Sequence, residues 1–458
     1  MALDETTPVT ELQEIVRPEH SILPAPTRIP SRVLGSGMDA LARRVRQSRK
    51  TGRILYVPGP GNVTGTYTHW TKGTDDPSIP SVGYSAQIYE VARHIGAKLV
   101  VLTNHSAPVA ETDGSVRFLR TPPMPNGRGV GYHLKAIRYG FSLVSHALRH
   151  RADTIIVQRN LAHFWPLGLA RLFGIRIVLS LHNTLWPAHR PPTRRERLVG
   201  WLNGWFFRRC DRVIGVSATI TAQVRAVAGP AARTAVQVPQ YKEANAHAFR
   251  VRASDAPLRD ILYLGRIEEN KGVFDLLDSF TRICRYRPDL RLRFVGSGGA
   301  LEALRARAAG TIAADRIEVP GPCDGDQVFA ELTRADLLVC PTTSRFAEGL
   351  AKTPVEAALA GVPSIVSTVV PVADLLGDAT RVVPVDDPEA LADALDCLAS
   401  EPGRLAAMSR AASEVRAQFF DRRQSLGACI LTALADEGAP KRASSVPVPR
   451  LSRVSRKA

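Results

Sequence analysis

The stretch that decides the fold is Glu348-Gly-Leu-Ala-Lys-Thr-Pro-Val-Glu356, in which two carboxylates bracket a short glycine-containing loop. This loop runs directly into the apolar segment VEAALAGVP. Upstream, the apolar segment ILYLG ends at Gly265-Arg266, and Lys271-Gly272 follows shortly after. Both places are typical of a strand that passes into a helix. A cationic pair and a spaced glutamate pair suit a ligand with an anionic middle and hydroxyl-rich ends, such as a nucleotide-sugar.

The spacing of Glu348 and Glu356 argues against paired acid–base catalysis. On one helix the two residues would lie about 12 Å apart along the axis, whereas the carboxylates of a glycoside hydrolase need about 5 to 9.5 Å. The pair therefore suits two separate grips on one elongated ligand. Two alternatives stay open: Thr353-Pro354-Val355-Glu356 matches a capping box with proline at the first helical position, and Glu348 is also compatible with a solvated loop.

The loop between the glutamates and the cations upstream form one candidate donor site. The backbone amides of residues 350–353 open a helix and can receive phosphate. Gly349, Leu350 and Ala351 are therefore donor-binding candidates. Arg266 and Lys271 neutralise phosphate well, although each can instead pair with Glu268 or Glu269.

Glycines beside this candidate site let the backbone approach a ligand closely, as at Gly265. Gly296, in the weaker glycine turn VGSGG, is a further donor-binding candidate. No Asp, Glu or His cluster has metal-ligand spacing, so we expect the cations to replace a divalent ion and expect no cofactor.

Two weaker signals lie in the first half of the chain. The turn VPGPGN and the residues after it place Gly61 and Gly65 on a candidate acceptor side. His182 ends the apolar segment LSLH and is either a sugar ligand or a hydrogen-bonded structural histidine.

Composition restricts the class of protein. The chain has 458 residues, 45% apolar and 22% charged, which is ordinary for a soluble protein of two or three domains. No apolar run approaches the roughly 20 residues that cross a bilayer, and the polar start contains no secretory h-region. The six scattered cysteines form no CxxC, which fits a reducing cytoplasm.

The formal net charge of +17 favours an anionic partner. Nucleic acid, an acidic membrane face and phosphorylated substrates all qualify. Much of the charge lies near the two ends of the chain, where a solvated tail without a fixed partner is the alternative.

Strand and helix patterns alternate along most of the chain. Apolar strands that alternate with helices indicate parallel, doubly wound sheets, so we predict an α/β fold of two Rossmann-like domains. A polar linker at 239–258 separates them, and the final helix, over about 403–435, is longer than its neighbours. The predicted parts are a disordered, basic extension (1–50), an acceptor-side domain (51–245), a nucleotide-sugar domain (255–410), a crossover helix (411–435) and a basic tail (436–458).

The segment RRERLVGWLNGWFFRR at 194–209 has basic ends and an apolar body. Leu198, Trp201, Leu202 and Trp205 follow helical spacing, so they indicate either a core-facing helix or a helix that lies on anionic lipid.

These motifs together resemble the family 4 glycosyltransferases of the GT-B fold, which are retaining enzymes. The resemblance covers about residues 53–435, and the two glutamates followed by AALAGVP are its most specific mark. It implies that Glu348 contacts the donor sugar and Glu356 holds the ribose. It also implies that Arg266 and Lys271 hold the diphosphate, and that His182 touches the sugar from the first domain. The resemblance further implies that the long final helix crosses back to the first domain.

The chain also departs from the family pattern. Val238-Pro239-Gln240-Tyr241 replaces the usual Asn-Gly after the linker strand, Gly349-Leu350-Ala351 replaces Gly-Phe-Gly, and Asn183 stands where an acid is frequent. These differences concern the identity of the donor more than the reaction.

We therefore expect a retaining, metal-independent transfer of a sugar from a nucleoside diphosphate sugar to a hydroxyl acceptor in glycan or polysaccharide assembly. A lipid-linked acceptor and peripheral contact with an anionic membrane, at the inner face of a cytoplasmic location, are expected by analogy. The alternatives are a GT-B nucleotide-sugar epimerase and a basic nucleic-acid-binding protein, although no nucleic-acid module is recognisable.

Overall fold

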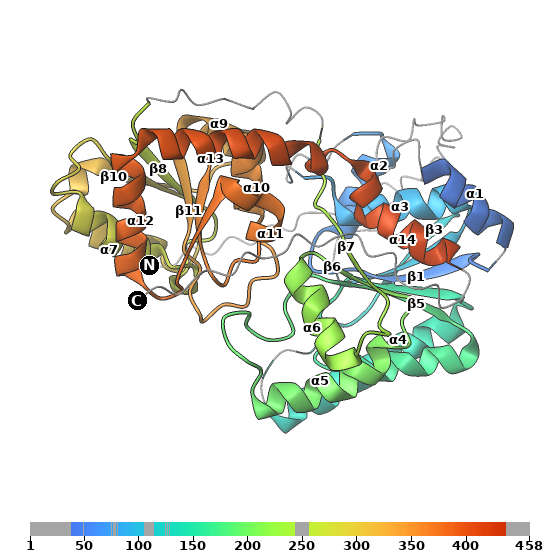
Figure 1. Ribbon diagram of the computed structural model, residues 1–458. Coiled ribbons are helices and arrows are strands. Elements are labelled where there is room, and N and C mark those ends of the chain that lie inside the picture. The colour runs from blue at the N-terminus through green and yellow to red at the C-terminus, as the bar shows by residue number, and fades with distance from the viewer. Residues whose placement is uncertain are drawn as a thin grey trace, which may run out of the picture. The chain divides into compact units, whose positions relative to one another are not determined.

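The computed structural model describes residues 38–436 except 49, 75, 77, 78, 80, 105–113, 124, 126, 128 and 243–255, and gives only the backbone at 325 and 326. Most of the predicted tails and the linker lie outside the described residues. The described chain contains two all-parallel sheets with helices on both faces, which confirms the predicted α/β class (Figure 1).

The first sheet has the order β3-β2-β1-β4-β5-β6-β7. Its inner strands are buried on both sides, which explains their almost continuous apolar sequences. The strands are β1 (Arg53–Val57), β2 (Lys98–Thr103), β3 (Val116–Arg120), β4 (Thr154–Val157), β5 (Arg176–Leu181), β6 (Arg212–Gly215) and β7 (Thr234–Val236). The helices between them are α2 (Val63–Thr71), α3 (Tyr84–Ile95), α4 (Val130–Arg149), the 3₁₀ helix η1 (Trp165–Phe173), α5 (Arg194–Phe207) and α6 (Ala218–Ala228).

The second sheet has the order β10-β9-β8-β11-β12-β13 and contains all the strands predicted for this half. They are β8 (Asp260–Leu264), β9 (Arg291–Val295), β10 (Ile317–Gly321), β11 (Leu337–Cys340), β12 (Ser364–Ser367) and β13 (Thr380–Val383). The helices are η3 (Glu269–Lys271), α7 (Val273–Ile283), α8 (Leu301–Ala309), η4 (Ala314–Arg316), α9 (Gly325–Arg334), α10 (Lys352–Leu359), α11 (Ala373–Leu376), η5 (Gly377–Ala379) and α12 (Pro388–Ser400).

Each sheet has one place where the strand order reverses. It lies between β1 and β4 in the first sheet and between β8 and β11 in the second. Open α/β sheets bind ligands in the crevice outside the carboxyl ends of the strands at such a switch point. The loops after these four strands are therefore where functional side chains are expected.

The prediction of a disordered extension through residue 50 is wrong for its last part. Helix α1 (Met38–Ser48) is regular, and Met38, Ala42 and Val45 form its buried face. These three residues follow i, i+4, i+7 spacing, so the helix buries one stripe. The sequence analysis overlooked this pattern because arginines and other polar residues separate the three.

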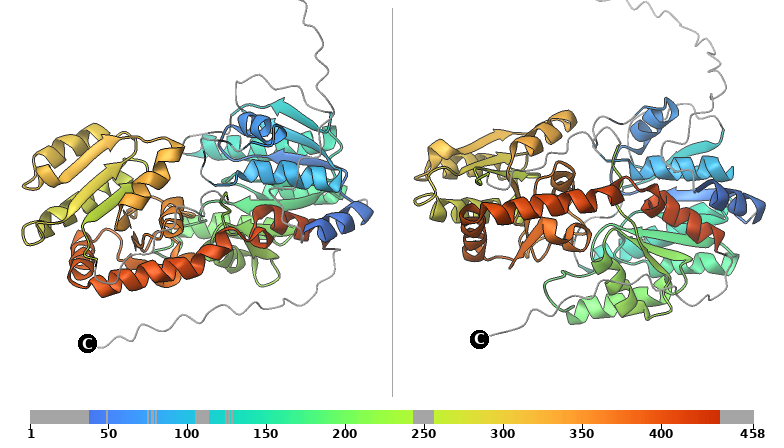
Figure 2. Two further views of the ribbon diagram at one scale, coloured as in Figure 1. Left: turned by 90° about the horizontal axis from the view of Figure 1, so that it is seen from above. Right: turned by 45° about the horizontal axis from the view of Figure 1, so that its top comes forward.

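The prediction of one long final helix is also wrong. The segment divides into α13 (Pro402–Val415), two 3₁₀ turns, η6 (Arg416–Phe419) and η7 (Arg422–Gln424), and α14 (Leu426–Ala435). Ser425 caps α14 by accepting a hydrogen bond from the amide of Ala428, so a new helix begins there. As Figure 2 shows, α13 follows the second domain and α14 lies beside α1 and α3 of the first.

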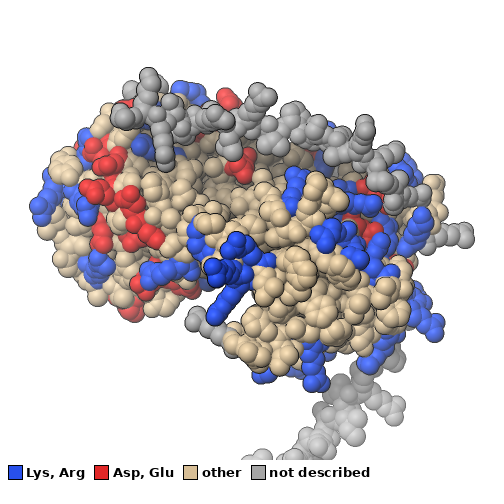
Figure 3. All heavy atoms as spheres, turned by 60° about the horizontal axis from the view of Figure 1, so that its bottom comes forward, with Lys and Arg blue, Asp and Glu red and all other residues tan. Residues whose placement is uncertain are grey.

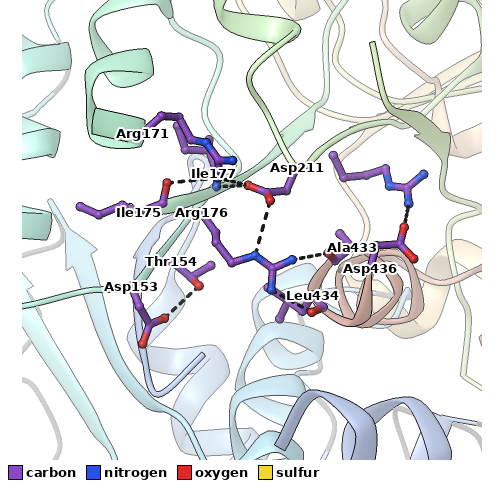
Figure 4. Close-up of polar contacts among 11 residues, drawn as sticks. Asp153, Thr154, Arg171, Ile175, Arg176, Ile177, Asp211, Ala433, Leu434 and Asp436 are labelled. Carbon is purple, nitrogen blue, oxygen red and sulfur yellow. Dashed lines mark hydrogen bonds and ion pairs between the residues drawn. The ribbon is translucent and has the colours of Figure 1, made fainter. Parts of the chain in front are cut away.

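A set of polar contacts holds the end of α14 against the first sheet (Figure 4). The guanidinium of Arg176 donates to the carbonyl oxygens of Ala433 and Leu434 at 2.6 and 2.8 Å. Asp211 accepts from both Arg171 and Arg176, at 2.8 and 3.5 Å. A positive charge at a helix C-terminus is favourable because the last carbonyls there lack helical partners.

Helix α5 divides the four apolar side chains for which a core face and a lipid face were both open. Leu202 and Trp205 are half-buried, and Trp205 packs against the core of the first domain. Leu198 is 60% exposed and Trp201 is 71% exposed. The buried residues are instead Gly200, Asn203, Gly204, Phe206 and Phe207. A Cβ at Gly204 would overlap the backbone of Val227 in α6, so glycines let α5 approach closely and turn Leu198 and Trp201 outward.

Candidate active site

A close, largely buried ion pair at the carboxyl edge of the second sheet joins Lys271 and Glu348. Lys271 Nζ lies 2.6 Å from Glu348 Oε2, and the two side chains are 14% and 12% exposed. Lys271 ends η3 in the loop after β8, and Glu348 follows β11 across the switch point. The alternative pairing of Lys271 with Glu268 or Glu269 is therefore wrong in this structure, since Lys271 is the partner of Glu348.

Arg266 lies in the same loop, and it forms the ion pair with Glu268 that the sequence left open as an alternative. Its guanidinium pairs with Glu268 at 3.3 Å, and both side chains are substantially exposed. Phe346 connects the two cations, because the Lys271 ammonium lies 3.6 Å and the Arg266 guanidinium carbon 5.4 Å from its ring centroid. A cation over a ring is attracted to it. The two charges are thus held near the same ring, and Arg266 is the more exposed of the two cations.

Glycine is required where the two loops of the donor side approach each other. Gly265 and Gly296 both have φ near +150°, and a Cβ at Gly296 would overlap the carbonyl oxygen of Gly265. The turns after β8 and β9 are therefore packed backbone against backbone.

A similar approach joins the Glu348 loop to the first domain. A Cβ at Gly349 would overlap the carbonyl oxygen of His182, directly after β5. The structure thus brings together Glu348, Lys271 and His182 from three separate strand ends.

His182 sits in a setting that keeps its imidazole neutral. Its ring contacts Tyr84 edge-on, with centroids 4.8 Å apart, and Nε2 lies 3.1 Å from the hydroxyl of Ser180. Burial, followed by the nearby charge of Lys352, lowers the pKa of His182 to about 4. At neutral pH the ring therefore offers one donor and one acceptor.

Lys352, the first residue of α10, connects the two domains. Its ammonium donates to the hydroxyl of Ser81 at 3.0 Å and lies 5.2 Å from the centroid of Tyr84. The sequence analysis missed this residue, although it stands inside the deciding stretch.

The capping-box interpretation of Glu356 is wrong. Helix α10 begins at Lys352 with Ala351 as its N-cap, and no side chain caps it. Glu356 is instead 5% exposed and accepts a 3.2 Å hydrogen bond from the hydroxyl of Tyr241. Burial raises the pKa of Glu356, while the charge of Lys352 and the Tyr241 hydrogen bond oppose that rise.

The remaining candidates have simpler surroundings. Leu350 packs against apolar clusters of both domains, and Ala351 is buried beside it. Gly61 has φ +151° with open space beside it. Gly65 belongs to α2, where the Asn62 side chain accepts from its amide at 2.9 Å. Gly61 is thus exposed in the turn after β1, at the switch point of the first sheet. The amide of Gly65 instead takes part in the N-terminal cap of α2.

Two further findings concern the described residues alone. No group of three or more His, Cys, Asp or Glu side chains among them is placed to hold a metal ion. None of their helices is both long and apolar enough to cross a bilayer.

Two family descriptions match the chain. "Glycosyl transferases group 1" matches residues 247–415, and "Glycosyl transferase 4-like domain" matches residues 83–239. The glycogen synthase of Mycobacterium tuberculosis is 26% identical over 311 residues, which cover 63% of this chain and 70% of that protein.

Solved structures share the fold. The crystal structure of Anabaena HepE in complex with UDP has a TM-score of 0.58 and 17% identity, covering 84% of this chain and 99% of that one. The trehalose 6-phosphate synthase of Burkholderia multivorans has a TM-score of 0.62 and 14% identity, covering 84% and 98%. Both likenesses extend over the two domains, and the relatives matched by sequence are glycosyltransferases. The chain belongs to the GT-B glycosyltransferases, with a 4-like first domain and a group 1 second domain.

Proposed function

We propose that this glycosyltransferase moves a sugar from a nucleoside diphosphate sugar to a hydroxyl acceptor, with retention of the anomeric configuration and without a metal ion. The observation that carries the proposal is the 2.6 Å contact of Lys271 with Glu348 at the switch point of the second sheet. It puts a cation for phosphate next to a carboxylate for sugar hydroxyls. Relatives support the donor class, since HepE structures contain UDP and UDP-glucose.

In this proposal each side chain of the candidate site has a separate role. Lys271 and Arg266, with the amides at the start of α10, would receive the diphosphate as negative charge develops on it. When the donor binds, Glu348 would accept hydrogen bonds from hydroxyls of the sugar. The ammonium of Lys271, its partner in this structure, would then be free to contact the diphosphate. His182, neutral and aligned by Ser180, would contact the sugar from the first domain. Glu356 would bind the ribose, and no divalent ion is needed in this scheme.

A donor screen tests the proposal. The protein is incubated with UDP-, GDP- and ADP-sugars, with and without a mixture of hydroxyl acceptors, and products are measured by mass and by the anomeric NMR coupling. Transfer that requires an acceptor and retains the configuration supports the proposal. Conversion of the donor without an acceptor would support the epimerase alternative, which the family match does not favour. Binding of no nucleoside diphosphate would overturn the proposal altogether.

We also propose that the enzyme contacts an anionic membrane, as expected for a lipid-linked acceptor in cytoplasmic glycan or polysaccharide assembly. The surface that supports this is the α4–η1–α5 face, since both α4 and α5 pack on η1. Its exposed apolar side chains are Val130, Leu134, Phe141, Leu148, Leu172, Phe173, Leu198 and Trp201. Trp and Leu beside basic residues suit a headgroup boundary.

Charge on this face fits anionic lipid. Exposed basic side chains lie among the apolar ones, namely Lys135, Arg138, Arg149, Arg194, Arg195, Arg197, Arg208 and Arg209. Figure 3 shows blue and tan spheres over the right-hand half, whereas most visible acids lie on the left. Helix α4 contains no acid in its 20 residues. A basic face with exposed Trp and Leu can therefore bind an anionic membrane in two ways, by charge attraction and by insertion of its apolar side chains.

A further inference from the structure

We propose that Arg159 forms a subsite for a phosphate group carried by the acceptor. This inference rests on the proposed function, because it names the chemical class of the acceptor. The subsite lies in the first domain, separate from the residues proposed for the donor diphosphate, and none of the sequence-derived candidates includes it.

Arg159 stands at the switch point of the first sheet. It follows β4 by two residues, and β4 lies between β1 and β5. Val157 pairs with Leu179, so the same register places Arg159 level with Leu181, one residue before His182. Adjacent strands are about 4.8 Å apart. Arg159 therefore lies one strand away from the histidine that meets the Glu348 loop.

The side chain of Arg159 is buried without a carboxylate. It is only 8% exposed. Its Nε donates to the carbonyl oxygen of Pro58 at 3.0 Å, and one Nη donates to the hydroxyl of Tyr139 at 3.3 Å. Within the part of the chain that the structure describes, it forms no ion pair.

These two neutral contacts leave most of the donor capacity of Arg159 for a ligand. A guanidinium has five N–H donors, and a buried charge is costly unless it is paired. A neutral side chain could brace Pro58 and Tyr139 at less cost. An arginine at this position is therefore explained by an anion that arrives with the substrate.

The helix that supplies Tyr139 adds to the positive potential. Lys135 precedes Tyr139 by one turn on the same face, and α4 contains no acid. The first turn of α4 lies about 13 Å from Tyr139 along the helix axis, so its amides are not counted in the subsite.

Gln158, the residue before Arg159, points to the other face of the sheet. Its Oε1 accepts from the Tyr56 hydroxyl on the side of α3, whereas Arg159 donates to Tyr139 of α4. The subsite on the α4 side therefore rests on Arg159 and not on Gln158.

Phosphate is the anion that fits this set best. Arginine binds phosphate bidentately, and the planar guanidinium of Arg159 still has unused N–H donors for it. The phosphate can belong to a soluble sugar phosphate or to the phosphate-bearing headgroup of a lipid acceptor. Both present the same chemistry to Arg159, and the experiment separates them.

The test measures anion binding while the donor site is filled. Full-length wild type, Arg159→Gln, Arg159→Lys and the control Arg225→Gln, at an exposed arginine of α6, are saturated with the nucleoside diphosphate that the wild type binds best. Calorimetry then measures inorganic phosphate, hexose 6-phosphate and unphosphorylated hexose. We expect wild type and Arg225→Gln to prefer hexose 6-phosphate over hexose, and Arg159→Gln to lose at least ten-fold in affinity for it. Arg159→Lys should fall between them.

A lipid arm identifies the source of the phosphate. Phosphatidylcholine vesicles with and without phosphatidic acid are compared for wild type and Arg159→Gln. Arg159-dependent binding of the phosphatidic acid vesicles supports a lipid acceptor, whereas Arg159-dependent binding of hexose 6-phosphate alone supports a soluble one. Equal affinities of wild type and Arg159→Gln in every arm overturn the proposal.

The controls keep the outcomes distinct. If Arg159→Gln does not fold by circular dichroism, Arg159→Lys and Tyr139→Phe carry the test, and unchanged affinity in both overturns the subsite. Wild type that binds no nucleoside diphosphate contradicts the proposed function, and the phosphate arm without nucleotide then still tests Arg159. Normal nucleotide binding with Arg159-independent phosphate binding contradicts only this inference.

Discussion

The hydroxyl of Tyr241 donates a 3.2 Å hydrogen bond to Glu356 Oε1, and both side chains are buried. The bond joins the segment after the last strand of the first sheet to the helix that carries the second glutamate of the deciding stretch. Tyr241 stands where the family pattern has another residue, so this chain orients Glu356 with a phenol. The bond fixes the orientation of the carboxylate that we propose for the ribose, at the cost of a buried charge.

Replacing Tyr241 by Phe should weaken both folding and nucleotide binding. Loss of the donor raises the pKa of Glu356 further, since the Tyr241 bond opposes the rise that burial causes. A carboxyl whose pKa is higher in the folded than in the unfolded state makes the protein less stable as pH rises through the interval between the two values. We therefore expect the variant to lose about 1 to 3 kcal/mol at pH 7 and less at pH 4, by urea unfolding.

The control for this variant is Tyr286→Phe, because Tyr286 is 66% exposed. It should unfold like the wild type. Nucleoside diphosphate affinity of Tyr241→Phe equal to the wild type would argue that Glu356 does not hold the ribose.

Glu348→Gln should nearly abolish transfer while nucleotide binding survives. The carboxylate lies next to the place proposed for the sugar, where charge develops in the transition state. The change also removes the charged partner of Lys271, which then remains available for the diphosphate. Turnover and nucleotide affinity are measured together, with Glu302→Gln, an exposed partner of Arg305, as the control. Turnover near that of wild type would refute the placement of Glu348.

Lys271→Ala should lower turnover by about 10²-fold or more. This is the scale expected for losing a preorganised group that stabilises a leaving group, about 2.7 to 4 kcal/mol. Added magnesium should not restore the activity, and excess chelator should leave wild-type turnover intact. Loss of wild-type activity in chelator would show that a metal ion takes part.

His182→Gln should reduce the loss of unfolding free energy that the wild type shows as pH falls below 6.5. The folded pKa of His182 is about 4, below its ordinary 6.5. Between these values the unfolded chain binds more protons, so wild type loses stability as pH falls from 6.5 to 4, by at most about 3 kcal/mol before solvent screening. Unfolding free energies at pH 7 and pH 4.5 measure the effect. An identical decrease in wild type and His182→Gln would contradict the neutral, enclosed imidazole.

Liposome co-sedimentation tests the α4–η1–α5 face. Wild type should bind vesicles that contain phosphatidylglycerol, and added salt should weaken the binding. A Leu198→Ser, Trp201→Ser double variant should bind several-fold less, because both side chains are exposed and available for insertion. The same change on another exposed pair, Tyr286→Ser with Ile312→Ser in the second domain, is the control. Equal binding to neutral vesicles would exclude charge recognition.

The strand pattern of this chain was largely readable from its sequence. Apolar strands buried on both faces of a parallel sheet are short and continuous, as at ILYLG and TIIV, and they alternate with helical spacing. The glutamate spacing, the Gly265-Arg266 turn and Lys271 pointed to the carboxyl edge of the second sheet for the same local reason. The apolar periodicity did not predict helix α1 or the division of the final helix into α13 and α14, because polar residues interrupt it there.

What the sequence by itself determined is therefore the class of fold, the family and the local positions of the donor candidates. Only the tertiary structure decided which groups meet: Lys271 with Glu348, Tyr241 with Glu356, and Lys352 with Ser81. It also decided that Trp201 faces outward and that Arg159 is buried without an acidic partner among the described residues. Periodicity reports how a segment presents its faces, whereas partners distant in the chain are chosen by strand order and packing.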